Sequence, residues 1–389
     1  MPARTSRRTY SARVTNLKVS NWRNFTQVDV PLQRRVFIVG PNASGKSNLL
    51  DALRFLRDIV AVGGGFQEAV RRRGGVSRIR CLAARRYSDV AIVVTIGGDD
   101  GQPTWQYTLE FRQDNRQRPL VKREHVQRDG ETLLDRPDET DEQDPERLSQ
   151  THLEQLNANQ QFRAVSDFFS SMRYLHIVPQ LVREPERFLG KTDDPYGSDF
   201  IETIARKTEK TRAAWLRRIR DALQLAVPQL RELELTRDVR GVPHLRGKYE
   251  HWRSQGAWQS ESDFSDGTLR LMGLLWALLE GGGPLMLEEP EIHLHEGVVR
   301  QIPQMINTMQ RRSGRQVFIS THSREMLSDD GIGMDEILLL RPTGEGTLTR
   351  LASQIQEVAD LLGGGIPMGD AVIPMTSPPR ASQLSLFGS

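Results

Sequence analysis

The hydrophobic positions of the chain form short strand-like runs interleaved with longer stripes at helical spacing. Residues 13–20, 26–30 and 35–39 each predict a strand, and the run at 35–39 is β-branched and aromatic in character. Residues 48–56 carry leucine and phenylalanine at helical spacing and predict a helix. The chain is therefore expected to pass from strands through a glycine-containing turn into this helix.

The same pattern continues toward the C-terminal end. Residues 89–96 and 105–111 predict an antiparallel pair joined by a GGDDGQP turn, and 121–126 with the turn at Asp129-Gly130 predicts a further hairpin. The acidic, proline-containing segment 135–146 predicts a solvated linker. The remaining predictions are helices at about 146–172 and 201–227, a strand at 174–178, a strongly apolar helix after residues 264–268, and strands at 285–287 and 317–321.

Composition narrows the class of protein. The 389 residues allow one large or two ordinary domains, and the net charge of +3 shows that the chain as a whole is not a polycation. A single cysteine, Cys81, excludes an internal disulfide and suits a reducing cytoplasm. The basic N-terminal residues precede no apolar stretch, and the longest apolar run, 271–279, is too short to span a bilayer. We expect a soluble, cytoplasmic protein with no membrane partner.

The stretch GPNASGKS fits the phosphate-loop pattern G-x-x-x-x-G-K-[ST] and lies between a predicted strand and a predicted helix. Its glycines allow the backbone N–H groups and the helix N-terminus to point at phosphates. Lys46 is expected to reach the β- and γ-phosphate oxygens, and Ser47 to place its hydroxyl on Mg²⁺. The predicted nucleotide-binding residues here are Gly40, Pro41, Asn42, Ala43, Ser44, Gly45, Lys46, Ser47 and Asn48.

Two carboxylates directly follow the apolar strand Leu-Met-Leu at 285–287. Strand ends at the carboxyl edge of a parallel sheet are where ligands bind. We assign Glu288 to Mg²⁺ and Glu289 to the attacking water as general base. The alternative is a solvated acidic turn.

Two further segments carry polar residues at element ends. Ser265-Asp266-Gly267 precedes the strongly apolar helix, where Ser265 fits an N-cap and the helix N-terminus would attract an anion. His322 ends the strand at 317–321. Alone, the first segment would be a capped core helix and His322 a structural histidine.

In this order, the motifs resemble the ABC-type ATPase head, in the branch that contains SMC, RecF-like and OLD-family proteins. The resemblance covers residues 12–355 and implies an α/β fold, an ABC-ATPase-like P-loop NTPase head with a mixed-sheet core, an antiparallel β subdomain and a helical insertion. It implies that Gln180 is the Q-loop residue that contacts metal and water, and that Ser265, Asp266 and Gly267 belong to the signature. It further implies that Glu288 and Glu289 form Walker B, that residues 291–295 form the D-loop, and that His322 is the switch histidine.

The sequence departs from the family pattern at two site positions. Glu288 stands where most relatives have aspartate, and Asp266 replaces a signature glycine. The span after His322 is too short for the TOPRIM nuclease domain of OLD-family nucleases. The expected division is a basic tail at 1–12, a first ATPase lobe at 13–111, an insertion at 112–172, a second lobe at 173–365 and a disordered tail at 366–389.

The resemblance implies that ATP lies between two heads, so an ATP-dependent homodimer is expected. Three functions then compete. The first is a DNA-associated ATPase that gates a separate effector, such as a TOPRIM-like nuclease in phage defence. The second is a RecF-like repair or replication factor that clamps DNA without a nuclease. The third, an ABC transporter subunit, is disfavoured by the long insertion and by the EEPEIHLH form of Walker B.

Two surfaces are candidates for partner binding. Arg71 to Arg73 and the basic helix at 206–220 are expected to contact nucleic-acid phosphates, with ordinary solvation as the alternative. The tail segment Gln383 to Phe387, QLSLF, resembles the peptide by which bacterial proteins dock on the replicative sliding clamp. An extended peptide can place its leucines and phenylalanine in an apolar pocket. The alternative is that these residues pack back on the head.

Overall fold

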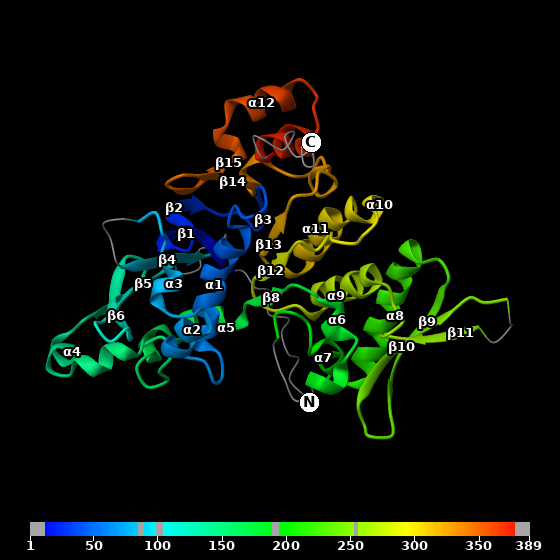
Figure 1. Ribbon diagram of the computed structural model, residues 1–389, viewed down its shortest axis with the longest axis horizontal. Helices are drawn as coiled ribbons and strands as arrows, with labels where there is room; N and C mark the ends of the chain where they lie inside the picture. The colour runs from blue at the N-terminus through cyan, green and yellow to red at the C-terminus, as the bar shows by residue number, and fades with distance from the viewer. Residues whose placement is uncertain (1–11, 85–88, 99–103, 189–193, 253–255, 378–389) are drawn as a thin grey trace, which may run out of the picture. The chain divides into compact units, whose positions relative to one another are not determined.

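The structure is a computed structural model (Figure 1), and it describes residues 12–84, 89–98, 104–188, 194–252 and 256–377. Residues 1–11 of the predicted basic tail and the QLSLF segment lie outside the described residues. The chain forms two compact units. The first contains residues 1–172, 282–286 and 310–389, and the second contains 173–281 and 287–309.

An antiparallel sheet in the first unit has the strand order β2-β1-β4-β5-β6-β7 (Figure 1). Along β4, the buried residues Val90, Ile92 and Val94 alternate with partly exposed residues, because one face of the sheet packs on the core. The predicted strands at the N-terminus, the predicted pair and the predicted hairpin are confirmed. The strands are β1 (Arg13–Trp22), β2 (Phe25–Pro31), β4 (Val90–Gly97), β5 (Trp105–Gln113), β6 (Pro119–Arg128) and β7 (Glu131–Arg136).

A second sheet of the first unit contains the strands in the order β15-β14-β3-β13-β12. β3 (Arg35–Val39) lies between β14 (Ile337–Thr343) and β13 (Val317–Thr321), and it pairs with both in parallel. Every residue of β3 and β13 is buried, which explains the apolar runs at 36–39 and 317–319. The other strands are β15 (Gly346–Leu351) and β12 (Leu285–Glu288), whose last two residues belong to the second unit.

Helix α1 (Lys46–Val60) packs in the core of the first unit, and Leu49, Leu50, Leu53 and Leu56 are among its buried residues. Phe55 of α1 stacks on Phe111 of β5 with 5.4 Å between the ring centroids. The other helices of this unit are α2 (Phe66–Arg72), α3 (Val76–Ile79), α4 (Glu139–Gln143), α5 (Arg163–Ser171), α12 (Gln356–Gly363) and α13 (Met368–Val372). The prediction of disorder over 366–389 is wrong for residues 368–376, which are helical because Met368, Ala371 and Val372 bury their side chains.

The second unit combines helices with a small antiparallel sheet of order β11-β10-β9. Trp276 of α9 meets Trp215 of α8 edge to face, with 4.9 Å between the ring centroids, in an apolar core. The elements are β8 (Arg173–Leu175), α6 (Pro179–Val182), α7 (Phe200–Ala205), α8 (Glu209–Ala226), β9 (Leu230–Arg237), β10 (Pro243–Tyr249), β11 (Ala257–Ser260), α9 (Asp266–Glu280) and α10 (Glu296–Val299). α11 (Ile302–Ser313) continues from this unit into the first.

Two helix predictions are wrong in extent. The stretch predicted as one helix at about 146–172 forms two short 3₁₀ turns and only the nine-residue α5. The stretch predicted as one helix at 201–227 is divided between α7 and α8 at residues 206–208. The apolar stripe of the latter is confirmed, since Leu216 and Ile219 are buried.

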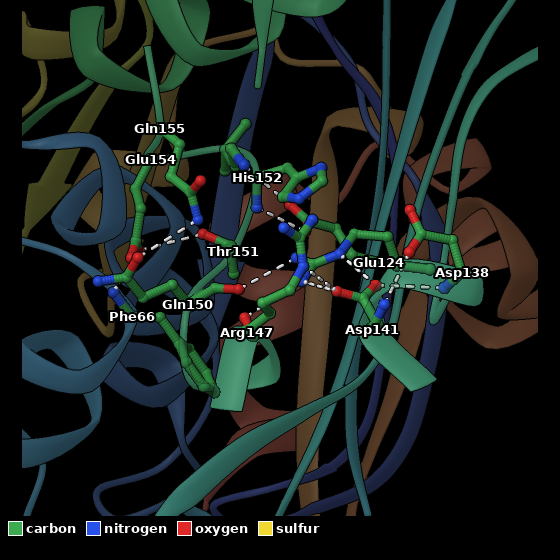
Figure 2. Close-up of polar contacts among 12 residues, drawn as sticks. Phe66, Glu124, Asp138, Asp141, Arg147, Gln150, Thr151, His152, Glu154 and Gln155 are labelled. Atoms are coloured by element: carbon green, nitrogen blue, oxygen red, sulfur yellow. Dashed lines mark hydrogen bonds and ion pairs between the residues drawn. The ribbon is translucent and has the colours of Figure 1, made fainter. Parts of the chain in front are cut away.

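The acidic segment at 135–146 is not a solvated linker, because part of it encloses a buried ion network (Figure 2). The Arg136 guanidinium lies 3.0 Å from Glu124 Oε2 and 2.8 Å from Asp141 Oδ1, and all three side chains are inaccessible to solvent. Backbone N–H groups of His152 and Leu153 also donate to Glu124. The prediction failed because it counted charges without locating the buried cation that pairs them.

Candidate functional site

The phosphate loop has the predicted strand–turn–helix setting, because β3 ends at Val39 and α1 begins at Lys46. Gly45 has φ 99°, a left-handed conformation that glycine adopts without steric cost. A Cβ on Gly45 would lie 2.2 Å from Asn24 Nδ2, so the loop also needs glycine there for space. Local geometry therefore requires the second glycine of the motif.

The N-terminus of α1 fits a phosphate group. The helix has no side-chain cap and no acidic residue in its first turn, so no side chain competes for its first N–H groups. Lys46 is 6 % exposed, and its Nζ donates to the carbonyl oxygens of Gly40 at 2.9 Å and Pro41 at 3.3 Å. Ser44 Oγ is buried without a hydrogen-bond partner. The first N–H groups of α1, together with the Lys46 ammonium beside the loop, suit a triphosphate.

Asn24 and Thr347, which the sequence did not predict as site residues, donate hydrogen bonds to the backbone of the phosphate loop. Asn24 Nδ2 donates to Ser44 O at 2.7 Å, and Thr347 Oγ1 donates to the same carbonyl at 2.9 Å. Asn48 Nδ2 donates to Asn24 Oδ1 at 2.9 Å, so Asn48 supports the loop through Asn24. No sequence signal could identify Thr347, which lies 303 residues from Ser44.

His322 follows β13 in the first unit. Thr321 pairs in parallel with Val39, the residue before Gly40. The parallel register thus places His322 and the start of the phosphate loop at the same edge of the sheet, where ligands bind in open α/β sheets. The His322 side chain is exposed at this edge.

The remaining predicted site residues lie in the second unit. Glu288 ends β12, and Glu289 follows it with φ 43°, a left-handed conformation uncommon for glutamate. His176 Nδ1 lies 3.2 Å from the carbonyl oxygen of Glu288, and burial lowers the pKa of His176. The neutral imidazole is therefore placed to donate to the backbone beside the paired carboxylates, a contact that sequence reasoning missed.

The signature segment begins helix α9 as predicted. Ser265 is the N-cap, and its Oγ accepts from Thr268 N at 3.2 Å. A Cβ on Gly267 would lie 2.5 Å from His293 O, so the 291–295 loop packs against the start of this helix. The Asp266 carboxylate contacts the guanidinium of Arg183, which follows α6. The Q-loop candidate Gln180 lies in α6 with an exposed side chain.

The arginines predicted to contact nucleic acid differ in burial and in their ion pairs. Arg73 is 9 % exposed and its guanidinium pairs with Asp51 at 2.7 Å and Asp58 at 3.0 Å, while Arg71 and Arg72 both pair with Glu68. The expectation that all three contact nucleic acid is wrong for Arg73, whose charge is already neutralised inside the fold. Arg217 and Arg218 are exposed on α8.

A parallel-sheet core with a phosphate loop, followed by a capped helix and paired carboxylates, defines a P-loop ATPase of the ABC-like head type. The sequence matches the family model described as "AAA domain, putative AbiEii toxin, Type IV TA system" over residues 35–328. The chain belongs to this family and is an ATP-hydrolysing enzyme. A search of curated proteins found no match.

Solved structures confirm the fold. A crystal structure of an Smc head bound to the C-winged helix domain of ScpA matches with a TM-score of 0.52 and 14 % identity, over 88 % of this chain and 99 % of that one. Smc heads from Pyrococcus furiosus and Pyrococcus yayanosii each match with a TM-score of 0.50 and 11 % identity, over 90 % of this chain and 100 % of theirs. Within the described residues, no helix is long and apolar enough to cross a membrane.

Proposed function

We propose that the protein is a DNA-associated ATPase that dimerises on binding Mg²⁺–ATP and gates a separate effector through hydrolysis. The observation that carries the proposal is that one chain contains two helix N-termini of the kinds that the family resemblance assigns to opposite sides of a composite ATP site. One is the phosphate loop at the start of α1, and the other is the capped N-terminus of α9. A two-fold pair of chains that joins the first site of each to the second site of the other would form two equivalent sites.

Each site residue has a defined task in this proposal. Lys46 and the N–H groups of the phosphate loop bind the triphosphate. Ser47 and Glu288 would hold Mg²⁺ together with Gln180, and the ion would neutralise charge on the phosphates. Glu289 orients and deprotonates the attacking water, and His322 donates to the phosphoryl group from the end of β13.

Two findings support an effector partner. The family description refers to toxin and toxin–antitoxin systems, in which an activity is held in check by another component. One matching Smc head binds a winged-helix domain of ScpA, so a head of this fold can dock a second protein. A TOPRIM-like nuclease in phage defence is the effector that we propose.

The exposed arginines of α8 are the proposed DNA contact, and the QLSLF segment is proposed to dock on a bacterial sliding clamp.

The second candidate is a RecF-like factor that clamps DNA without a nuclease partner. The resemblance of the head to Smc heads favours it. The two candidates are distinguished by purifying the chain with the protein encoded beside it and measuring DNA cleavage with and without ATP. Cleavage that depends on ATP and on the second protein supports gating, whereas ATP-dependent DNA retention without cleavage supports the clamp.

The test of the ATPase itself uses Glu289→Gln and Lys46→Ala. Glu289→Gln retains the side-chain shape but removes the base, so we expect hydrolysis to fall by about 10²–10⁴-fold while ATP binding continues. This variant should accumulate an ATP-bound dimer in light scattering, and Lys46→Ala should form none. Glu296→Gln, an exposed residue of α10, is the matched control and should behave as wild type. A wild-type rate in Glu289→Gln would overturn the base assignment.

A further inference from the structure

Asp266 is the acidic residue at the start of α9, and its carboxylate contacts basic side chains. Arg183 Nη2 lies 2.5 Å from Asp266 Oδ1 and also donates to Phe264 O at 2.8 Å. His293 Nδ1 lies 3.5 Å from the other carboxylate oxygen, Oδ2. Both Asp266 oxygens therefore face basic side chains, which come from two other segments of the second unit.

The backbone reinforces these contacts. The carbonyl oxygen of His293 lies against Gly267, where a Cβ would be only 2.5 Å from that oxygen. His293 itself has a left-handed backbone conformation, with φ 63°. The segment after α6, the start of α9 and the loop after β12 therefore meet at one point. Those are the segments that carry Gln180, the signature and the D-loop.

The charge of Asp266 conflicts with the proposed role of this helix end. Asp266 is the first residue of the 15-residue helix α9, where the N-terminal dipole attracts anions. Its side chain is 28 % exposed, so an uncompensated carboxylate there would repel an incoming triphosphate. Arg183 supplies the opposite charge at contact distance.

We propose that Arg183 is a positioning residue that neutralises Asp266 and so permits an acidic residue at the nucleotide-facing end of α9. Arg183 at the same time fixes the signature to the segment after Gln180. This inference rests on the proposed composite ATP site. It explains how the chain tolerates aspartate at the start of α9, and it makes the two residues a charge-compensated pair.

The test is a rescue experiment with Arg183→Met, Asp266→Asn and the double variant. Arg183→Met should raise the ATP concentration for half-maximal hydrolysis and dimerisation by about tenfold, with little change in kcat, because the uncompensated carboxylate weakens ATP-dependent closure. The double variant should recover to within about threefold of Asp266→Asn, since no negative charge remains to be neutralised.

Arg187→Met is the matched control, because Arg187 lies four residues further on, is largely exposed and pairs with Glu184. It should leave the ATP dependence unchanged. Binding of a fluorescent ATP analogue to the monomer reports the phosphate loop alone, and should be the same in all variants. That measurement, with the thermal unfolding midpoint, verifies that each variant is folded.

The outcomes separate the inference from the proposed function. A purely structural clamp predicts that the double variant is as impaired as Arg183→Met, since the bond to Phe264 O is still lost, and that result would overturn charge compensation. An Arg183→Met variant that matches wild type would also overturn it, while leaving the ATPase proposal intact. A wild-type protein that binds the analogue but never dimerises with ATP would refute the composite site, and the inference with it.

Discussion

Replacing Glu154 by glutamine tests whether a buried carboxyl makes the stability of the first unit depend on pH. Glu154 Oε2 accepts from Phe66 N at 2.6 Å and from Thr151 Oγ1 at 3.1 Å beside the buried Arg136 network (Figure 2). Burial raises the pKa of Glu154 from 4.5 to about 7, against the lowering effect of these two hydrogen bonds. Glutamine retains an acceptor for both donors but cannot ionise.

The magnitude follows from proton linkage. A carboxyl whose pKa is about 7 when folded and 4.5 when unfolded is shifted by about 2.5 units, and at about 1.36 kcal/mol per unit this is about 3 kcal/mol. Between these pH values the folded state binds more protons than the unfolded state, so stability falls as pH rises. The wild type should therefore lose about 3 kcal/mol relative to Glu154→Gln between pH 4 and pH 8.

The neighbouring His152 acts in the opposite direction. Burial and the charge of Arg136 lower the pKa of His152 from 6.5 to about 4, so its contribution to stability is lost as pH falls through that range. The wild-type profile alone is therefore flattened where the two effects overlap. Because His152 is unchanged in Glu154→Gln, its contribution cancels in the difference between the two proteins.

The assay is urea unfolding of both proteins, followed by circular dichroism at several pH values from 4 to 8. Glu146→Gln is the matched control, because Glu146 lies in the same region with a side chain that is 70 % exposed. Its difference from the wild type should be independent of pH to within about 0.5 kcal/mol. A similarly flat difference for Glu154→Gln would refute the argument that burial holds this carboxyl protonated near neutral pH.

Three further predictions concern nucleotide and partner binding. Asn24→Ala removes the donor to Ser44 O and should weaken nucleotide binding to the monomer by about tenfold, measured with a fluorescent ATP analogue, whereas Asn16→Ala on β1 should have no effect. Equal affinity in Asn24→Ala would contradict its support of the loop. Charge reversal at Arg217 and Arg218 should weaken DNA binding for all sequences alike and reduce its salt dependence, as fluorescence anisotropy would measure; unaltered binding would remove α8 from the proposed contact. A fluorescent peptide of residues 376–389 should bind a bacterial sliding clamp, and Leu386→Ala/Phe387→Ala should abolish the binding. Equal, negligible binding by both peptides would contradict the docking proposal.

The parts of the fold that the sequence predicts correctly are those with local physical signals. The strand before the phosphate loop is apolar from Val36 to Val39 because β3 is buried on both sides, and the glycine and lysine pattern follows it at once. Ser265 was identifiable because an N-cap needs only its own side chain and the first turn of the helix. Such features depend on neighbours within a few residues, so the sequence displays them directly.

The parts that the sequence does not predict depend on contacts between distant segments. The burial of Asp141 requires the Arg136 guanidinium, and that in turn requires Glu124 on another strand. Thr347 contacts the phosphate loop from β15, whose position depends on its pairing with β14. The segment 146–172 was predicted as a helix from local residue types alone. In the fold Leu153 and Phe162 are buried, and much of this segment forms turns instead, because tertiary packing outweighs local helix propensity.

The backbone at Walker B adds a physical reason for two adjacent carboxylates to take different roles. Side chains alternate between the faces of a strand, so Glu288 at the end of β12 is oriented by the strand itself. The alternation stops at Glu289, whose φ of 43° costs of order 1 kcal/mol in a residue that is not glycine. A solvated acidic turn has no need of this strain, since glycine or asparagine would relieve it at the same position. A glutamate in this conformation directly after the metal-ligand candidate is compatible with the proposal that Glu289 is the base and Glu288 the ligand.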